Sequence, residues 1–265
     1  MPCGVTRRMY IDSHCHINFP DLAGRLPEVF ERMAANDVSH ALCIGVELEK
    51  FPEIRALAEA HPNVYASVGV HPDHEDCTEP TVDELVALAD HAKVVAIGET
   101  GLDYFRLTGD LEWQRERFRT HIRAARRCGK PLVIHTRSAA EDTLRIMREE
   151  DAGEVGGVMH CFTESLAVAQ AAIELGFHIS FSGIVTFKNA AALREVAAAI
   201  PLERMLIETD SPYLAPVPHR GKTNEPGYVK HVAEEIARVR GISPEAVGEA
   251  TTANFFRLFA AARRG

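Results

Sequence analysis

The triplet His14-Cys15-His16, in the stretch MYIDSHCHINF at residues 9–19, places three types of metal ligand side by side. In a strand, residues i and i+2 lie on the same face, so His14 and His16 face one way and Cys15 faces the other. Two imidazoles on one face form half of a site for a transition metal. Two ordinary histidines are an equally good interpretation of this pair, so the metal hypothesis needs more ligands.

Further candidate ligands stand where short apolar runs end. They are His71 in VGVHPD, Glu99 in AIGETGLDY, His135 in VIHTR, His160 in VMHCF and Asp210 in LIETDSPYL. Whether these residues meet depends on the elements that carry them.

Eight short apolar runs predict strands, at residues 9–16, 40–46, 64–71, 93–99, 131–136, 156–161, 177–182 and 204–210. The segments between them carry apolar residues at i, i+3 and i+4, which predicts helices, for example at 26–36, 80–92, 112–129, 139–151, 165–176 and 189–200. This repeat of strand and helix predicts a (β/α)8 TIM barrel. A doubly wound open sheet is the competing architecture. This sequence has no Gly-x-Gly-x-x-Gly after its first predicted strand, which excludes the dinucleotide-binding version of that sheet.

The C-terminal part of the chain, about residues 225–262, has the pattern of two further amphipathic helices. Ser243-Pro244-Glu245 is a typical helix start, with Ser at the cap and Pro at the first position. No linker or low-complexity segment interrupts the chain. We therefore predict one domain over residues 1–265.

A TIM barrel gathers the C-terminal ends of its strands at one mouth, where active sites lie. Imidazoles and carboxylates crowded there would stay unsatisfied without a shared cation. The candidates exceed the needs of one ion, so we predict two divalent ions with Glu99 between them, held by His14, His16, Glu99, His135, His160 and Asp210. A two-metal centre activates water for hydrolysis and needs no Ser or Cys nucleophile. Cys15 and Cys161 are predicted to pack behind the barrel.

The composition limits the classes of function. The formal charge of −9 is opposite to that of proteins that coat nucleic acid with a basic surface, so a nucleic-acid substrate must be gripped locally. The first eight residues contain no apolar segment typical of a secretory signal, and no run approaches a membrane span. Six scattered cysteines without a Cys-x-x-Cys pair indicate reduced thiols and a cytoplasmic protein.

At these residues the chain resembles the TatD family of metal-dependent deoxyribonucleases, part of a wider superfamily of barrel hydrolases. The matching stretches are DSHCH (12–16), VGVHPD (68–73), IGETGLDY (97–104), VIHTR (133–137), HCF (160–162), ETDSPYLAP (208–216) and RGKTNEP (220–226). The resemblance implies a (β/α)8 barrel, a divalent-metal site, phosphodiester hydrolysis and the same six ligands. Imidazole-rich ligation suits Zn or Mn, whereas the family suggests Mg.

Three residues are predicted to act in catalysis. Asp210 would orient the attacking water and take its proton, and Glu99 would bridge the ions. His71 would contact a phosphate oxygen or help the leaving group, although it can also be an ordinary histidine beside Pro72.

Other polar residues have open alternatives. Arg137 shares a face with His135 and can grip phosphate or form a surface ion pair. Glu208 can contact the substrate or support a ligand, and Asp12 is a candidate partner of the ligands. Arg220 lies in a polar loop that either contacts substrate or ties the C-terminal helices to the barrel.

The leading hypothesis is a deoxyribonuclease that uses a metal-activated water on single strands or strand ends. The alternative is a small-molecule hydrolase acting on a lactone, ester or cyclic amide at the same site, which the acidic charge favours slightly. A non-catalytic metal-binding protein is a third and weaker hypothesis. No obligate protein partner and no membrane association are expected.

Overall fold

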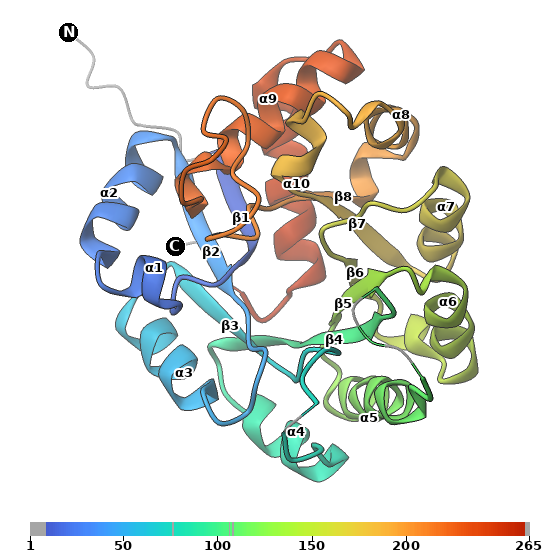
Figure 1. Cartoon of the computed structure of the whole chain (residues 1–265). Coiled ribbons are helices and arrows are strands. Elements are labelled where there is room, and N and C mark those ends of the chain that lie inside the picture. Colours follow the sequence, from blue (N-terminus) through green and yellow to red (C-terminus); the bar gives the residue numbers. More distant parts are fainter. Residues whose placement is uncertain (1–8, 76, 106, 108, 263–265) are drawn as a thin grey trace, which may run out of the picture.

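The computed structural model describes residues 9–75, 77–105, 107 and 109–262. Eight parallel strands follow one another around a barrel in chain order, with helices packed outside it (Figure 1). The strands are β1 (Tyr10–Cys15), β2 (Val38–Cys43), β3 (Val64–Val68), β4 (Val94–Asp103), β5 (Leu132–Arg137), β6 (Gly157–Met159), β7 (Phe177–Phe181) and β8 (Met205–Ile207). The predicted TIM barrel is confirmed.

The helices occupy the connections between strands and the C-terminal part of the chain. They are α1 (Pro20–Ala23), α2 (Leu26–Ala35), α3 (Phe51–Ala60), α4 (Val82–Ala89), α5 (Glu112–Cys128), α6 (Ala140–Glu149), α7 (Leu166–Glu174), α8 (Ala191–Ala199), α9 (Val229–Arg240) and α10 (Pro244–Leu258). Short 3₁₀ turns lie at 152–154, 183–186, 202–204 and 226–228.

The barrel closes where the chain beyond β8 runs along β1. The main-chain N–H of Asp210 donates to the carbonyl oxygen of His14 at 2.9 Å, and that of His16 donates to Ser211 at 2.8 Å. These bonds bring the two ends of the barrel sequence together. They also place three of the predicted ligands at the same seam.

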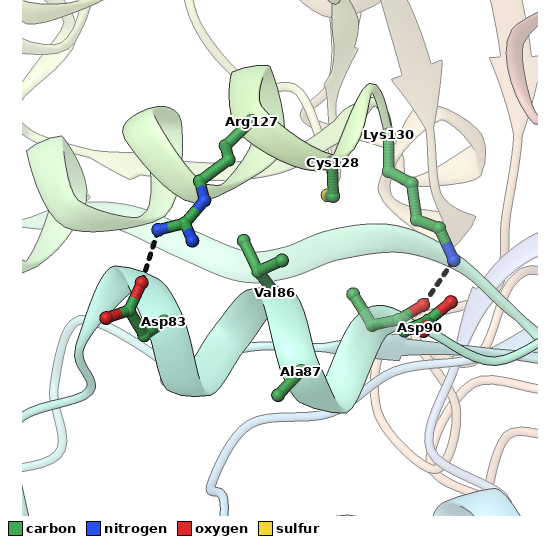
Figure 2. A pocket seen from close by; sticks show the side chains of 8 residues that line it. Asp83, Val86, Ala87, Asp90, Arg127, Cys128 and Lys130 are labelled. Carbon is green, nitrogen blue, oxygen red and sulfur yellow. Dashed lines mark hydrogen bonds and ion pairs between the residues drawn. The ribbon is translucent and has the colours of Figure 1, made fainter.

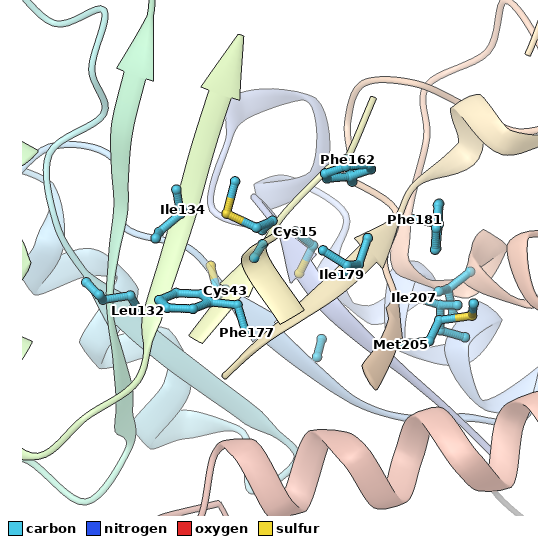
Figure 3. Close-up of a cluster of buried hydrophobic side chains, with 14 of the residues drawn as sticks. Cys15, Cys43, Leu132, Ile134, Phe162, Phe177, Ile179, Phe181, Met205 and Ile207 are labelled. Carbon is cyan, nitrogen blue, oxygen red and sulfur yellow. The ribbon is translucent and has the colours of Figure 1, made fainter. Parts of the chain in front are cut away.

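Two separate apolar cores stabilise the barrel. The larger core lies between the strands and the outer helices, and Figure 3 shows a part of it that includes Cys15, Phe177 and Ile179. The smaller core fills the inside of the barrel. Removing this apolar surface from water is the main favourable contribution to the stability of both layers.

Helix α10 contributes to the inner core. Phe255 in this helix and Phe259 just after its end are fully buried in the same cluster as Ile11 and Leu206 of the strands. The helix begins as the sequence predicts, because the Ser243 hydroxyl accepts a hydrogen bond from the main-chain N–H of Ala246 at 3.1 Å. The final predicted helix is therefore part of the barrel's packing.

Strand β4 is longer than the sequence pattern predicts. The expected end was residue 99, but the strand pairs with β5 as far as Asp103, where Gly101 lies opposite His135. Gly101 has a φ of +134°, and a Cβ there would collide with the His135 carbonyl oxygen. Glu99 consequently lies inside β4 and not at its end.

Several other strands end earlier than predicted. β2, β3, β6 and β8 end at residues 43, 68, 159 and 207, whereas ends at 46, 71, 161 and 210 were expected. Cys161 and Asp210 have left-handed φ angles of 42° and 56°, which an extended strand does not allow. His71, His160 and Asp210 therefore lie in the segments that follow their strands.

The cysteines agree with the prediction in part. None of the five described cysteines forms a disulfide, and Cys15 is buried behind the barrel as expected. Cys161 differs, since the residue is only partly buried and its thiol lies 3.2 Å from the Ser182 hydroxyl. The left-handed backbone at this residue breaks the alternation of faces on which the expectation rested. Cys3 and the rest of residues 1–8 lie outside the described residues.

Over the described ranges, none of the helices has the length and apolar character that crossing a membrane requires.

Helix α5 presents three buried polar side chains to the loop that carries His71. The Gln114 amide donates to the Pro72 carbonyl at 2.9 Å, and the Arg117 guanidinium donates to the His71 carbonyl at 3.0 Å. The His121 Nε2 accepts from the main-chain N–H of Val70 at 3.0 Å, and its Nδ1 donates to the Arg117 carbonyl. These bonds fix the loop from the outer layer.

His121 should make the protein sensitive to acid. Burial lowers its pKa to about 4, whereas the unfolded chain has the ordinary value of 6.5. The unfolded state therefore binds a proton more readily than the folded state does. The contribution of neutral His121 to the free energy of unfolding is fully present above pH 6.5 and is lost as the pH falls towards 4. His121 alone contributes about 3 kcal/mol to this loss. Urea unfolding in EDTA across this range should show a flatter pH profile for His121→Gln.

The matched control is His91→Gln, because His91 is only half-buried. Its pH profile should follow that of the unmodified protein. An unchanged profile in His121→Gln would contradict the assignment.

Candidate metal centre

The first group of ligand atoms lies at the seam between β1 and the segment after β8. The Nε2 atoms of His14 and His16 lie 3.3 Å apart. Asp210 Oδ1 is 3.6 Å from the first and 3.5 Å from the second. The three side chains thus converge on one point, which is the arrangement that the His-x-His pair needs for metal binding.

The second group surrounds Glu99 of β4. Its Oε1 lies 2.7 Å from His160 Nε2, 3.2 Å from His135 Nδ1 and 3.4 Å from His71 Nε2. Its Oε2 lies 3.4 Å from His14 Nε2, which belongs to the first group. The structure therefore brings the six predicted ligands together, with one carboxylate between the two groups and His71 beside them.

The charges of this cluster depend on one another. Burial alone would raise the pKa of the Glu99 carboxyl, but the imidazoles of His160, His71 and His14 hold it well below its usual range. Burial would lower the pKa of His160, but Glu99 and Glu208 hold it well above. Burial and the charge on His160 lower the pKa of His14. These shifts favour an ionised Glu99, a charged His160 and a neutral His14.

The donor atoms fit a divalent cation. The Nδ1 atoms of His14 and His16 are buried and lack a hydrogen-bond partner among the described residues, while the Nε2 atoms face each other and Asp210. At 3.3 Å one Nε2 can donate to the other, and when both rings carry their proton on Nδ1 the two Nε2 lone pairs face each other. A cation shared with the carboxylate satisfies both lone pairs.

Across the described part of the chain, three overlapping sets of ligand atoms lie within 4.8 Å of one another. They are His14–Glu99–His160, His14–His16–Asp210 and His71–Glu99–His135. Glu99 joins two of these sets and His14 joins two, so the residues can hold metal in one continuous centre.

Glu208 supports a ligand from behind. It is fully buried, and its Oε1 accepts from His160 Nδ1 at 3.1 Å and from the main-chain N–H of Cys161 at 2.7 Å. A carboxylate on the far nitrogen fixes the tautomer and orientation of a metal-binding histidine. This position favours the support role over substrate contact, which the sequence left open.

Asp103 was missed by the sequence reasoning. It lies 3.1 Å from His135 Nε2 and is almost completely buried, so it supports His135 as Glu208 supports His160. Its spacing of four from Glu99 in IGETGLDY is the signal that could have found it, because residues i and i+4 of a strand share a face. Ending the predicted strand at residue 99 concealed that spacing.

Asp12 holds the backbone on both sides of the seam. Its Oδ1 accepts from the main-chain N–H of Thr209 at 2.8 Å and of His14 at 3.3 Å, and its Oδ2 accepts from the Thr209 hydroxyl at 2.5 Å. The Asn224 amide donates to the Thr209 carbonyl at 2.9 Å. Asp12, which the sequence offers as a candidate partner of the ligands, thus positions His14 and the segment before Asp210 through bonds to His14 N–H and to Thr209.

The remaining predicted contacts lie at the edge of the mouth. His71 Nδ1 is 2.5 Å from Asp73 Oδ1. The Arg137 guanidinium stacks on the ring of Phe105 at 3.8 Å. The Arg220 guanidinium lies 3.7 Å from the Phe187 ring. Their roles in binding substrate stay predictions.

The polar loop after β8 divides into two kinds of residue. Asn224 and Glu225 are buried, and Glu225 forms ion pairs with Arg32 and Arg25. Arg220 and Lys222 are exposed. The buried pair therefore ties the loop to the barrel and to the segment around α2, while the exposed cations are available to an anionic ligand.

A cavity between α4 and α5 lies outside the centre (Figure 2). Its two cations have partners within the protein. Arg127 forms an ion pair with Asp83, and the Lys130 ammonium donates to main-chain oxygens, including that of Val94 at 2.5 Å. Burial raises the pKa of the Cys128 thiol, which makes it a poor nucleophile.

Comparison with known proteins identifies relatives over nearly the whole chain. A family model described as TatD related DNase matches residues 11–260. An uncharacterized metal-dependent hydrolase of Escherichia coli K12, YcfH, is 46% identical over 253 residues, which cover 94% of this chain and 95% of that protein.

Two further matches are more distant. The 3'-5' ssDNA/RNA exonuclease TatD of Citrobacter rodentium is 35% identical over 238 residues, covering 88% of this chain and 90% of that protein. The crystal structure of YJJV, a TatD homolog from Escherichia coli K12, superimposes with a TM-score of 0.89 and 30% identity, covering 97% of this chain and 99% of that chain.

Removing the supporting carboxylates should weaken metal binding without removing a ligand. Asp103→Asn and Glu208→Gln are each expected to weaken binding of Mn²⁺ about 10- to 100-fold, because an amide holds the imidazole less firmly than a carboxylate. Calorimetric titration of metal-stripped protein measures the affinity. Asp83→Asn, at an exposed ion pair on α4, is the matched control and should bind as the unmodified protein does.

An unchanged affinity in both Asp103→Asn and Glu208→Gln would show that these carboxylates do not orient metal ligands.

Proposed function

Because the chain belongs to the family of TatD-related DNases, we propose that its metal centre hydrolyses phosphodiester bonds in DNA, acting on single strands or strand ends. Membership of this family agrees with the resemblance in the sequence, and the chain is a metal-dependent hydrolase. The observation that carries the proposal is the position of Glu99, whose two oxygens face two different groups of ligands.

Two divalent ions would share this centre. His14, His16 and Asp210 would hold one, and His135 and His160 would hold the other, with Glu99 between them. When bound, such a pair of ions lowers the pKa of water and neutralises charge on the phosphate oxygens. Mg, Mn and Zn are the candidates.

The chain's own residues have separate roles in this reaction. Asp210 is 17% exposed, against 3% for Glu99, so it is the carboxylate that can orient the attacking water and accept its proton. His71, at the rim with Asp73 on its far nitrogen, would contact a phosphate oxygen or the leaving group. The exposed guanidinium of Arg137 would bind a neighbouring phosphate.

The choice of nucleic acid draws support from a relative whose name states an exonuclease activity on single-stranded DNA and RNA. The alternative, hydrolysis of a lactone, ester or cyclic amide at the same centre, draws support from the charge of −9, since a small substrate needs no basic surface.

Substitution of the two catalytic carboxylates tests the mechanism. Asp210→Asn and Glu99→Gln are each expected to lower kcat on a short DNA oligomer, with Mg²⁺ or Mn²⁺ present, by at least about 100-fold, because each removes a charge that the reaction uses. Gel analysis of the cleaved oligomer measures the rate. Asp83→Asn should retain the full rate, and full activity in both test variants would refute the mechanism.

A substrate panel separates the two candidate functions. Metal-stripped protein is supplied with Mg²⁺, Mn²⁺ or Zn²⁺ and offered single-stranded DNA, duplex DNA, lactones, esters and cyclic amides. We expect cleavage of single-stranded DNA above all other substrates. Turnover of a small substrate without cleavage of DNA would establish the alternative.

A further inference from the structure

Two aromatic rings stand exposed beside the metal centre. Phe105 is 60% exposed and Tyr213 is 56% exposed, which makes them the most exposed large apolar side chains in the described part of the chain. Exposed apolar rings cost hydration free energy, so their position needs an explanation. Each is connected to the ligands by a short series of contacts.

Tyr213 is connected to the first group of ligands. Its main-chain N–H donates to the Asp210 carbonyl at 3.0 Å. Its ring meets Phe19 edge to face at 6.4 Å, and Phe19 stacks on the imidazole of His16 at 4.7 Å with an interplanar angle of 16°. The exposed ring is therefore the outermost member of an aromatic series that begins at a ligand.

Phe105 is connected to the second group. Its main-chain N–H donates to Asp103 Oδ1 at 2.9 Å, and the other oxygen of that carboxylate supports His135. The Arg137 guanidinium lies against the Phe105 ring at 3.8 Å. This cation lies over the ring and places a positive charge next to it.

The two rings lie on opposite sides of the mouth. Tyr213 follows β8 and Phe105 follows β4, and these strands are four places apart in either direction around a ring of eight. The metal ligands lie between them. A chain molecule that crosses the mouth therefore meets one ring before the metal centre and the other after it.

We propose that Tyr213 and Phe105 each stack an unpaired base of a single-stranded nucleic acid, one on each side of the phosphodiester that lies at the metal centre. This assignment rests on the proposed function and names the form of its substrate. Every base has a flat π-face, so such stacking tolerates any sequence. A base pair inside a duplex offers no free face, so the rings select single strands and unpaired ends.

Stacking also explains how an acidic protein can bind a strand of nucleic acid. With a net charge of −9, the chain cannot attract a polyanion by a broad basic surface. Two rings and the neighbouring Arg137 grip the strand locally. The binding free energy then comes mainly from stacking of the bases. The phosphates need to contact only the metal centre and a few cations.

The test compares a short thymidine oligomer with an abasic strand of the same length, which keeps the phosphates and lacks the bases. The unmodified protein should cleave the thymidine strand with the higher kcat/KM. Tyr213→Leu and Phe105→Leu should each lower kcat/KM on the thymidine strand by between about 5-fold and 150-fold, mainly through KM, and leave the abasic strand unchanged. Tyr213→Phe and Phe105→Tyr keep a ring and should keep the preference.

The control is Ile242→Ala, an exposed apolar residue between α9 and α10, which should behave as the unmodified protein. Equal cleavage of both strands by the unmodified protein, or an equal loss on both strands in the Leu variants, overturns the stacking assignment and leaves the nuclease activity standing. Failure of the unmodified protein to cleave either strand refutes the proposed function itself.

Discussion

The buried carboxylate of Glu99 is the charge on which the mouth of the barrel depends. It is 3% exposed and faces four imidazoles, so it would be very costly without compensating positive charge. Glu99 and Glu208 hold the pKa of His160 well above its usual range, which favours a proton on this imidazole beside Glu99. Metal binding must displace this proton, which makes the affinity for metal depend on pH.

The rest of the structure holds the groups around that carboxylate in place. His135 and the carboxylate of Asp103 behind it lie on neighbouring strands of the barrel, and two apolar cores stabilise these strands. The loops are fixed by main-chain hydrogen bonds from buried side chains, among them Asp12 and Gln114. The centre is therefore held by buried groups, whereas Arg137 and Tyr213 beside it are exposed.

Sequence reasoning can predict the barrel and the convergence of six ligands, because parallel strands bring their C-terminal ends to one place whatever the details of the loops. It does not predict where each strand ends. Gly101 prolongs β4 through a close approach to β5, and the left-handed residue Cys161 leaves the strand pattern. Both effects depend on neighbouring strands, and periodicity contains no information about them. Asp103 was missed for this reason.

The closure of the barrel has a consequence for the order of events during synthesis. His14 is among the first described residues to leave the ribosome, whereas Asp210 comes much later, and the Phe259 ring that fills the barrel interior comes later still. The growing chain therefore cannot assemble the predicted set of ligands until it has been made as far as Asp210. Any fragment of the chain that ends before Asp210 therefore lacks a member of the predicted set.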